Sequence, residues 1–331
     1  MSRIEERLKD VWYGGREPGV ALRALSALYG VVAQARRAAY QRGWLRVHRV
    51  GAPVIVVGNI TIGGSGKTPL VIALVEHLRA RGWKPGVVGR GYGRSSRGQV
   101  VVDATTSALD GGDEPVLIAR RCQVPVVVDA DRVAAARRVV ELGADIVIAD
   151  DGLQHYRLHR DIEIEVIDGA RRRGNERLLP AGPLREPVQR ASECDLCVAN
   201  GGASEVGEWP MKLIGDTLSR SDGAGQPIDE WRGRRVHAIA GIGNPDRFFR
   251  ALRERGLDVV EHAFGDHHAF VPDDLRFGED LPVVMTEKDW VKCIGFAPAY
   301  AWMLPVRAEC PEAFFADFAS RLESRIGKRR D

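Results

Sequence analysis

Lysine is the scarcest charged residue of this chain: of 48 basic residues among 331, seven are lysine. The net charge of +3 does not demand a nucleic-acid partner. No apolar run approaches the ~18 residues that cross a bilayer, and the first residues lack the apolar core of a secretory signal. We therefore expect a globular protein on the cytosolic side, with no nucleic-acid partner and no obligate protein partner.

Cysteine is also scarce, with five residues in the whole chain. An odd number in a chain of this length does not build a disulfide framework. Cys194 and Cys197 form a Cys-x-x-Cys pair, but no second pair and no nearby His pair completes a zinc-binding set. We interpret the two as apolar residues of a strand.

Acidic residues are missing altogether from Pro18 to Val75, where six arginines and Lys67 fall. Within this stretch, residues 20–35 carry one charge and present apolar side chains at helical spacing. The basic residues that follow are interleaved with Tyr40 and Trp44. The pattern is typical of an interfacial helix on an anionic membrane surface. It equally fits an N-terminal helix docked on its own core, and the pattern does not decide between the two.

Strands and helices alternate over the rest of the chain. Apolar strands at 53–59, 85–91, 125–130 and 144–152 alternate with helical patterns of 10–14 residues, which predicts an α/β fold with a parallel sheet covered on both faces. A second pattern of this kind begins at residue 235. We predict three segments: a membrane-associating amphipathic segment (1–50), a core lobe (51–225), and a smaller α/β lobe closed by a C-terminal helix (226–331).

A glycine-rich loop stands directly between the first strand and its helix. This context is what a phosphate-binding P-loop requires, because backbone N–H groups and a helix N-terminus then converge on the phosphates. In this pattern Lys67 reaches the β- and γ-phosphates of ATP, and the Thr68 hydroxyl holds Mg²⁺. The expected nucleotide-binding residues are Thr61, Ile62, Gly63, Gly64, Ser65, Gly66, Lys67 and Thr68.

Three acidic or histidine motifs accompany the P-loop. Asp150 and Asp151 end a predicted strand, where paired carboxylates suit a cation, although a solvent-facing loop pair is the alternative. Asp113 and Glu114 open a predicted helix, and simple N-terminal capping would also explain them. Residues 266–268 (Asp-His-His) lie in a polar loop and are acid–base candidates.

The ordered motifs resemble one enzyme family. The run VVGNITIGGSGKTP, GRGYGR, GGDEP, DADR, IADDGLQH, GNERLLPAGPLREP, AGIGNPDRFF, GDHHAF and TEKD is similar to the tetraacyldisaccharide 4′-kinases. The resemblance implies a P-loop fold that transfers the ATP γ-phosphoryl group to the 4′-hydroxyl of an acylated glucosamine disaccharide 1-phosphate in lipid A biosynthesis. It also implies peripheral association with the cytoplasmic face of the inner membrane.

The resemblance also assigns roles to individual residues. It makes Asp113 the catalytic aspartate, paired with His267, with Lys67 acting on the phosphates. It places Arg185 at the nucleotide. The residues it places near Mg²⁺ are Thr68, Asp150, Asp151 and Glu186.

Two other functions fit the sequence less well. A P-loop switch or metal-chaperone NTPase would carry a base-selecting [NT]KxD motif, but in residues 286–289 (Thr-Glu-Lys-Asp) the Lys and Asp are adjacent, so the spacing fails. A soluble kinase of small metabolites does not explain the acid-free apolar N-terminus.

Overall fold

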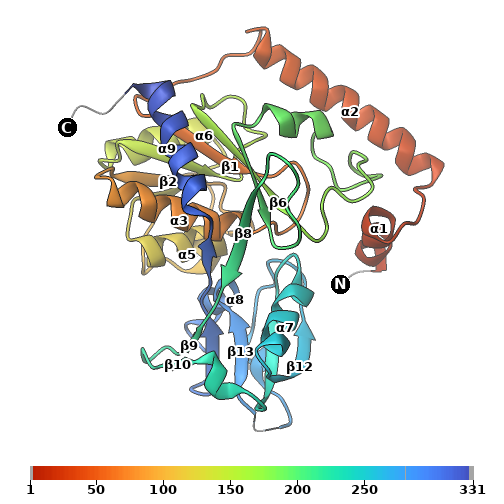
Figure 1. Ribbon diagram of the computed structural model, residues 1–331, viewed down its shortest axis with the longest axis vertical. Helices are drawn as coiled ribbons and strands as arrows, with labels where there is room; N and C mark the ends of the chain where they lie inside the picture. The colour runs from red at the N-terminus through yellow and green to blue at the C-terminus, as the bar shows by residue number, and fades with distance from the viewer. Residues whose placement is uncertain (1–2, 280, 328–331) are drawn as a thin grey trace.

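The strands predicted in the first half of the chain pair into one sheet whose centre is parallel (Figure 1). The computed structural model describes residues 3–279 and 281–327. In the described part this sheet has nine strands, and its antiparallel pairs lie at the two edges. Across the sheet the strands are β15 (Arg307–Glu309), β8 (Trp209–Ile214), β7 (Leu196–Asn200), β6 (Ile162–Asp168), β1 (Val54–Gly58), β5 (Ile146–Asp150), β2 (Pro85–Gly89), β4 (Val126–Val128) and β3 (Val100–Val102).

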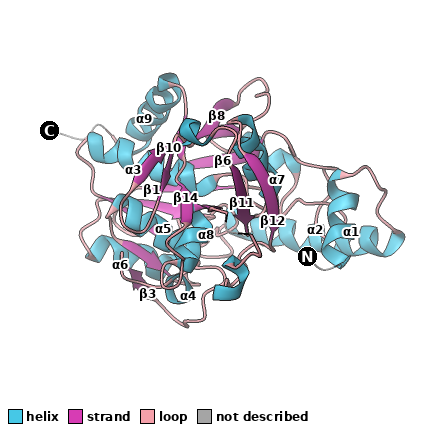
Figure 2. Cartoon of the chain, turned by 90° about the horizontal axis from the view of Figure 1, so that it is seen from below, coloured by secondary structure: helices cyan, strands magenta, loops and turns pink. Residues whose placement is uncertain are grey.

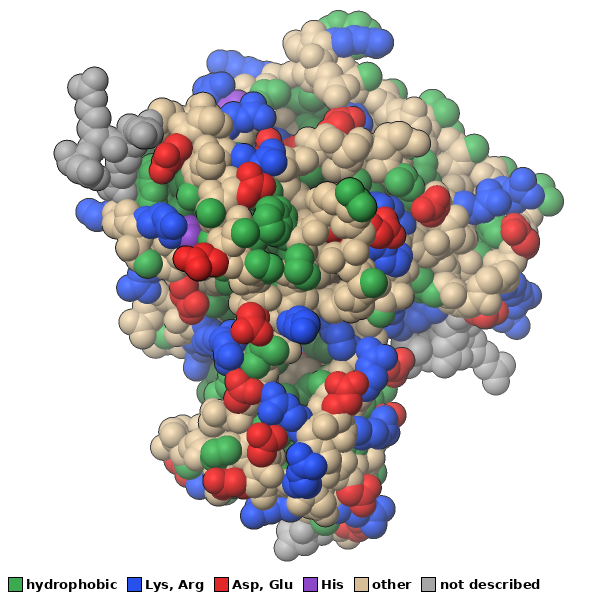
Figure 3. Space-filling model, in the orientation of Figure 1, with side chains coloured by type: hydrophobic (Ala, Val, Ile, Leu, Met, Phe, Trp, Pro, Cys, Tyr) green, Lys and Arg blue, Asp and Glu red, His purple; other side chains and the backbone are tan. Residues whose placement is uncertain are grey.

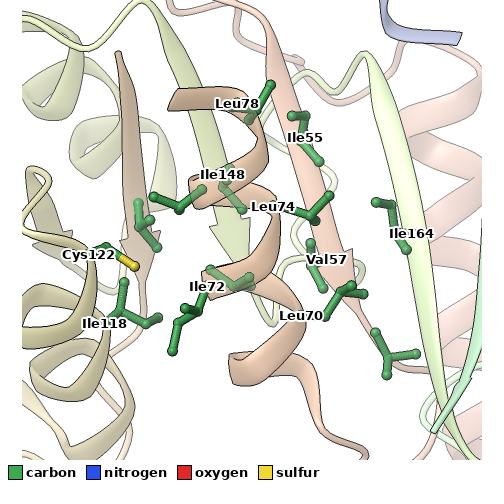
Figure 4. Close-up of a cluster of buried hydrophobic side chains, with 14 of the residues drawn as sticks. Ile55, Val57, Leu70, Ile72, Leu74, Leu78, Ile118, Cys122, Ile148 and Ile164 are labelled. Atoms are coloured by element: carbon green, nitrogen blue, oxygen red, sulfur yellow. The ribbon is translucent and has the colours of Figure 1, made fainter. Parts of the chain in front are cut away.

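Helices cover both faces of this sheet, as predicted, because side chains of the central strand point alternately to opposite sides. Ile55 and Val57 of β1 pack with one set of helices, and Val54 and Val56 pack on the opposite side. Figure 4 shows the side chains of Ile55 and Val57 on the same side of the sheet as Leu70 and Leu74. The helices of this lobe are α3 (Lys67–Ala80), α4 (Ala108–Gly111), α5 (Asp113–Cys122), α6 (Arg132–Glu141), the 3-10 helix η1 (Val188–Glu193) and α9 (Glu312–Ile326).

A second sheet, with six strands among the described residues, forms the smaller lobe. Its apolar residues also divide into a cluster on each face. The strands, in order across the sheet, are β10 (Gly225–Pro227), β9 (Thr217–Ser219), β14 (Ala301–Leu304), β13 (Val283–Thr286), β11 (Arg235–Ala240) and β12 (Asp258–Ala263). The helices are η2 (Ile228–Trp231), α7 (Pro245–Glu254), η3 (Pro272–Leu275) and α8 (Glu287–Cys293).

Two short connections join the lobes. The chain leaves the large sheet after β8 and enters the small sheet at β9, and it returns between β14 and β15. The molecule narrows there, and basic and acidic side chains alternate over the smaller lobe (Figure 3). Site residues that come from both lobes therefore depend on how the lobes meet.

The C-terminal helix departs from the prediction. Residues 226–331 were expected to form the smaller lobe, closed by that helix. Instead β15 pairs with β8 of the large sheet, and Phe314 and Phe318 of α9 are fully buried in the core that contains α3. The sequence predicted a C-terminal helix here, but the spacing of its apolar residues does not say which lobe buries them.

Two helices precede β1, namely α1 (Arg3–Tyr13) and α2 (Val20–Gln41). They lie at one side of the larger lobe (Figure 1, Figure 2). No helix among the described residues combines the length and the apolarity that crossing a bilayer requires.

The interpretation of the Cys-x-x-Cys pair as strand residues is confirmed for Cys197 and wrong for Cys194, which caps the end of the 3-10 helix η1. Cys197 lies in β7, Cys194 comes just before that strand, and both are free thiols. Burial raises the pKa of Cys194 to about 12. In the part of the chain that the structure describes, no group of three His, Cys, Asp or Glu side chains could hold a metal ion.

The placement of α9 gives a stability prediction. Phe314→Ala should lower the free energy of unfolding by about 3–5 kcal/mol, since it empties a fully buried site next to α3. Glu323→Ala, on the exposed side of the same helix, is the matched control and should change it by less than about 0.5 kcal/mol. Urea unfolding measures both. Equal, small effects would mean that α9 is not part of the core.

Candidate active site

The predicted P-loop connects β1 to α3. Gly66 has φ 93°, a left-handed conformation that suits glycine, and it comes directly before the first residue of α3. A Cβ atom at Gly66 would lie 2.1 Å from Nδ2 of Asn200. The loop therefore closes against a neighbouring strand and leaves no room for a side chain at this position.

Two asparagines that the sequence analysis did not select hold the loop in shape. Asn59, just after β1, donates from Nδ2 to the carbonyl of Gly63 at 3.2 Å and accepts from Lys67 Nζ at 3.2 Å. Asn200, at the end of β7, donates to the carbonyl of Ser65 at 2.8 Å. The signal that could have found both is their position at the carboxyl ends of predicted parallel strands, where such folds bind ligands.

The long Gly/Pro/Arg-rich loop packs on the start of the P-loop. The Ile62 N–H donates to the carbonyl of Pro183 at 2.9 Å, and Thr61 forms a β-bridge with Leu184. The next residue, Arg185, donates its N–H to the carbonyl of Ile60 at 2.7 Å and so lies beside the P-loop; its expected contact with the nucleotide stays a prediction.

The two predicted acidic residues have different environments. The guanidinium of Arg185 binds both oxygens of Asp151 at 3.0 Å, and Lys67 Nζ lies 3.6 Å from the same carboxylate. Burial alone would raise the pKa of Asp151, but these two cations outweigh it and lower the pKa to about 2. Asp151 is therefore neutralised by protein side chains.

Asp150 differs from its neighbour in having a free oxygen. Parallel pairing sets Asp150 opposite Val57, one strand away from the P-loop strand. Its Oδ1 is buried and has no hydrogen-bond partner in the protein. Burial, reinforced by the charge of Glu114, raises the pKa of Asp150 to about 7. A buried carboxylate with an unpaired oxygen suits a bound cation.

These residues fit a Mg²⁺ ion at a nucleotide site. Mg²⁺ is usually held by one or two protein oxygens together with substrate phosphates and water, and Asp150 with the buried Thr68 supplies such a set. Glu186 is less available, since its carboxylate accepts hydrogen bonds from Gln154 and Tyr156. Its expected place at the metal stays a prediction that these bonds do not favour.

Asp113 and His267 meet across the two lobes. Asp113 opens α5 in the larger lobe, and His267 follows β12 in the smaller one. His267 Nδ1 lies 2.8 Å from Asp113 Oδ2. Burial works against ionisation of Asp113, but the hydrogen bond from His267 and the charge of Lys288 lower its pKa to about 2. The carboxylate therefore accepts the hydrogen bond, and Nδ1 of His267 carries the proton.

The other histidine of this motif has a local role. His268 Nε2 lies 2.9 Å from Asp274 Oδ2, and its ring packs against Phe264 and Phe270. It therefore orders the loop after β12, and His267 is the histidine of the pair that reaches the larger lobe.

The smaller lobe also touches the P-loop itself. A Cβ atom at Gly243 would lie 2.5 Å from the backbone nitrogen of Gly64. Arg171 donates to the carbonyl of Gly243 at 2.8 Å, and Asn244 donates to Asp168 at 3.2 Å. The lobes therefore meet both at the phosphate-binding loop and at the Asp113–His267 pair.

Comparison with known proteins agrees with this geometry. The family profile described as tetraacyldisaccharide-1-P 4′-kinase matches residues 19–323. The chain belongs to this family. A tetraacyldisaccharide 4′-kinase of Stenotrophomonas maltophilia (strain R551-3) is 54% identical over 323 residues, which cover 94% of this chain and 95% of the relative. One of Xanthomonas campestris pv. campestris (strain 8004) is 49% identical over the full length of both.

A solved structure of LpxK from Aquifex aeolicus in complex with ATP is similar in fold, with a TM-score of 0.76 and 30% identity. The similarity covers 91% of this chain and 98% of that one. Family membership and fold make the chain an ATP-dependent lipid A 4′-kinase and confirm the predicted function class.

The free oxygen of Asp150 yields a metal-dependence prediction. Asp150→Asn should raise the Mg²⁺ concentration for half-maximal rate at least about tenfold, because it removes the charge that faces the cation. Steady-state kinetics over a Mg²⁺ titration measure this, with folding checked by circular dichroism. Asp145→Asn, at the opposite end of β5, is the control. An unchanged titration in a folded Asp150→Asn protein would make this carboxylate structural.

Proposed function

We propose that Asp113 is the base for transfer of the ATP γ-phosphoryl group to the 4′-hydroxyl of a tetraacylated glucosamine disaccharide 1-phosphate. The observation that carries this assignment is the 2.8 Å contact between Asp113 and His267 across the lobes. Glu114, the neighbour of Asp113, is close enough to raise the pKa of Asp150 at the P-loop. This influence supports a single site that contains both the base and the expected metal residues.

The chemistry follows from the charges of these groups. A sugar hydroxyl is a weak nucleophile at neutral pH, so a carboxylate that accepts its proton contributes about 10²–10⁴-fold. His267 orients Asp113 and shares the proton that the pair takes up. Lys67, which is held by Asn59 and Asp151, lies where its charge would act on the phosphates. Mg²⁺, when bound at Thr68 and Asp150, supplies further positive charge to the phosphates.

The lobe contacts support a site that is assembled by closure. The base comes from one lobe and its histidine from the other, and the turn at Gly243 lies against Gly64. Water that enters an open site would compete with the sugar hydroxyl for the phosphoryl group. Contact between the lobes excludes that water when substrate is bound.

We further propose that α2 binds the anionic cytoplasmic surface of the inner membrane. Its polar and small face docks on the protein: Ser26 Oγ donates to the carbonyl of Leu178 at 2.7 Å, and the Tyr29 hydroxyl donates to that of Arg185 at 2.8 Å. Its apolar face is uncovered. The exposed large apolar residues of this segment are Val20, Leu25, Leu28, Val31, Val32, Trp44, Leu45 and Val47.

This arrangement connects the membrane surface to the site. The docked face of α2 contacts the loop that carries Arg185, and Arg185 binds Asp151 beside Lys67. An acceptor whose acyl chains stay in the bilayer presents its sugar head at the surface, because each CH₂ withdrawn costs about 0.8 kcal/mol. A helix that lies on that surface would hold the P-loop within reach of the head.

The catalytic assignment is tested by a double-mutant cycle. Asp113→Asn should lower kcat about 10²–10⁴-fold with little change in KM for ATP, because the base acts on the acceptor proton. Adding His267→Ala to Asp113→Asn should cost little more, since the two residues work as a unit. Transfer of labelled phosphate from ATP to a detergent-dispersed tetraacyldisaccharide 1-phosphate measures the rates. Additive losses would argue against the pair.

The membrane assignment is tested by cosedimentation with anionic liposomes. Binding of the wild type should weaken with salt, because each arginine near an anionic surface contributes about 1 kcal/mol that salt screens. A salt-resistant part should persist, and Leu25→Glu with Leu28→Glu should remove it. The double mutant should also raise the apparent KM for the lipid acceptor.

The matched control is Leu109→Glu with Val206→Glu, which alters two exposed apolar residues outside α1 and α2. If folded Leu25→Glu/Leu28→Glu protein cosediments like the wild type at high salt, α2 is not the membrane contact.

A further inference from the structure

The Thr-Glu-Lys-Asp motif at 286–289 is not part of the phosphate site, yet it lies where the two lobes meet. It spans the end of β13 and the start of α8. Thr286 caps α8, accepting from the N–H of Asp289 at 3.1 Å. The carboxylate of Asp289 is fully buried and accepts from the N–H of Gly241 at 3.0 Å. These two residues fix the helix start, and the two between them reach the other lobe.

Glu287 and Lys288 hold the two ends of α5. Glu287 is bound by Arg121, in the last turn of α5, at 3.0 and 3.1 Å. Lys288 Nζ lies 3.0 Å from Glu114, in the first turn of the same helix. This helix, α5, begins with the proposed base, Asp113, so the smaller lobe binds both ends of the helix that carries the base.

The ammonium of Lys288 also faces the base itself. Its Nζ lies 3.7 Å from Asp113 Oδ2, the oxygen that contacts His267, and 3.5 Å from Asp266 Oδ1. The side chain is 17% exposed. The desolvation of this site disfavours its charge, but the three surrounding carboxylates outweigh that effect and raise the pKa of Lys288. A permanent positive charge therefore sits beside the Asp113–His267 pair.

We propose that Lys288 is a positioning residue of the phosphoryl transfer, which sets the orientation and the proton affinity of the Asp113–His267 pair from the smaller lobe. The proposal rests on the proposed role of Asp113. Lys288 and His267 both belong to the smaller lobe. When that lobe closes, the ammonium of Lys288 therefore reaches the pair together with His267 and favours loss of a proton from the pair.

The sign of the effect follows from the charges around the pair. The charged and titratable groups facing it are Lys288 and Lys292 from α8, Asp266 from the loop after β12, and Tyr92 from the loop after β2, whose ring centroid lies 4.8 Å from that of His267. Glu114 of α5 lies beside them and binds Lys288. A nearby cation stabilises the deprotonated pair, so removal of the ammonium leaves the pair protonated up to a higher pH. The pair accepts the hydroxyl proton only in its deprotonated form, so activity should rise with pH as the pair titrates.

The experiment compares pH–rate profiles of acceptor phosphorylation. Lys288→Met should move the acidic limb of kcat upward by about one to three pH units. It should lower kcat at pH 7 about ten- to a hundredfold, with KM for ATP nearly unchanged. Lys288→Arg, which restores the charge, should return the limb towards the wild-type position. Lys84→Met, an exposed lysine just before β2, is the control and should leave the profile unchanged.

A second variant keeps the proposal testable if Lys288→Met does not fold. Glu114→Gln removes a carboxylate beside the pair and keeps the ammonium, so its acidic limb should move downward by about one unit. If the acidic limb of kcat does not move in folded Lys288→Met, the role of Lys288 is overturned and the proposed function still stands. The same holds for Glu114→Gln if Lys288→Met does not fold. A wild type that does not phosphorylate the acceptor at any pH would instead refute the proposed function.

Discussion

Parallel pairing between β1 and β5 determines where the charges of the site stand. The pairing sets Val57 beside Asp150, so the acidic pair ends next to the strand that leads into the P-loop. Lys67 then lies between Asn59 and Asp151, and its ammonium is held in place before any phosphate arrives. The strand register thus sets the positions of Lys67 and the two aspartates, and the surrounding loops form the rest of the site around them.

The two acidic neighbours show how burial and partners separate equivalent residues. Asp151 is neutralised by Lys67 and Arg185, while Asp150 keeps an unpaired buried oxygen. Their pKa values consequently move in opposite directions. Such a division supports the proposal that Asp151 has a structural role and that Asp150 binds the cation, although the sequence presents them as an identical pair.

The sequence predicted those parts of the molecule in which local pattern and physical role coincide. The P-loop could be found because a strand, a glycine-rich turn and a helix follow one another directly. The motifs of Asp113 and His267 were visible in the sequence, but their pairing came from the resemblance, since no local pattern brings together residues 154 positions apart. Asn59 and Asn200 were missed because an asparagine at a strand end has no distinctive spacing, and its value depends on which loop lies beside it. The position of α9 could not be predicted either, because an apolar face on a helix indicates that the face is buried but does not indicate which element it packs against.

The N-terminal helix shows why its pattern fitted two interpretations. A helix that is apolar around most of its circumference is compatible with docking on the protein and with binding to a membrane. In α2 one face is docked on the protein and another is exposed. The docked side uses a serine hydroxyl, a tyrosine hydroxyl and Gly30, where a Cβ would lie 2.8 Å from Leu178. The leucines and valines of α2 other than the half-buried Leu22 are left exposed, the reverse of what a helix that stabilises only its own core would show. Since the docked side supports the loop of Arg185, the same helix joins an apolar outer surface to the charges at the P-loop.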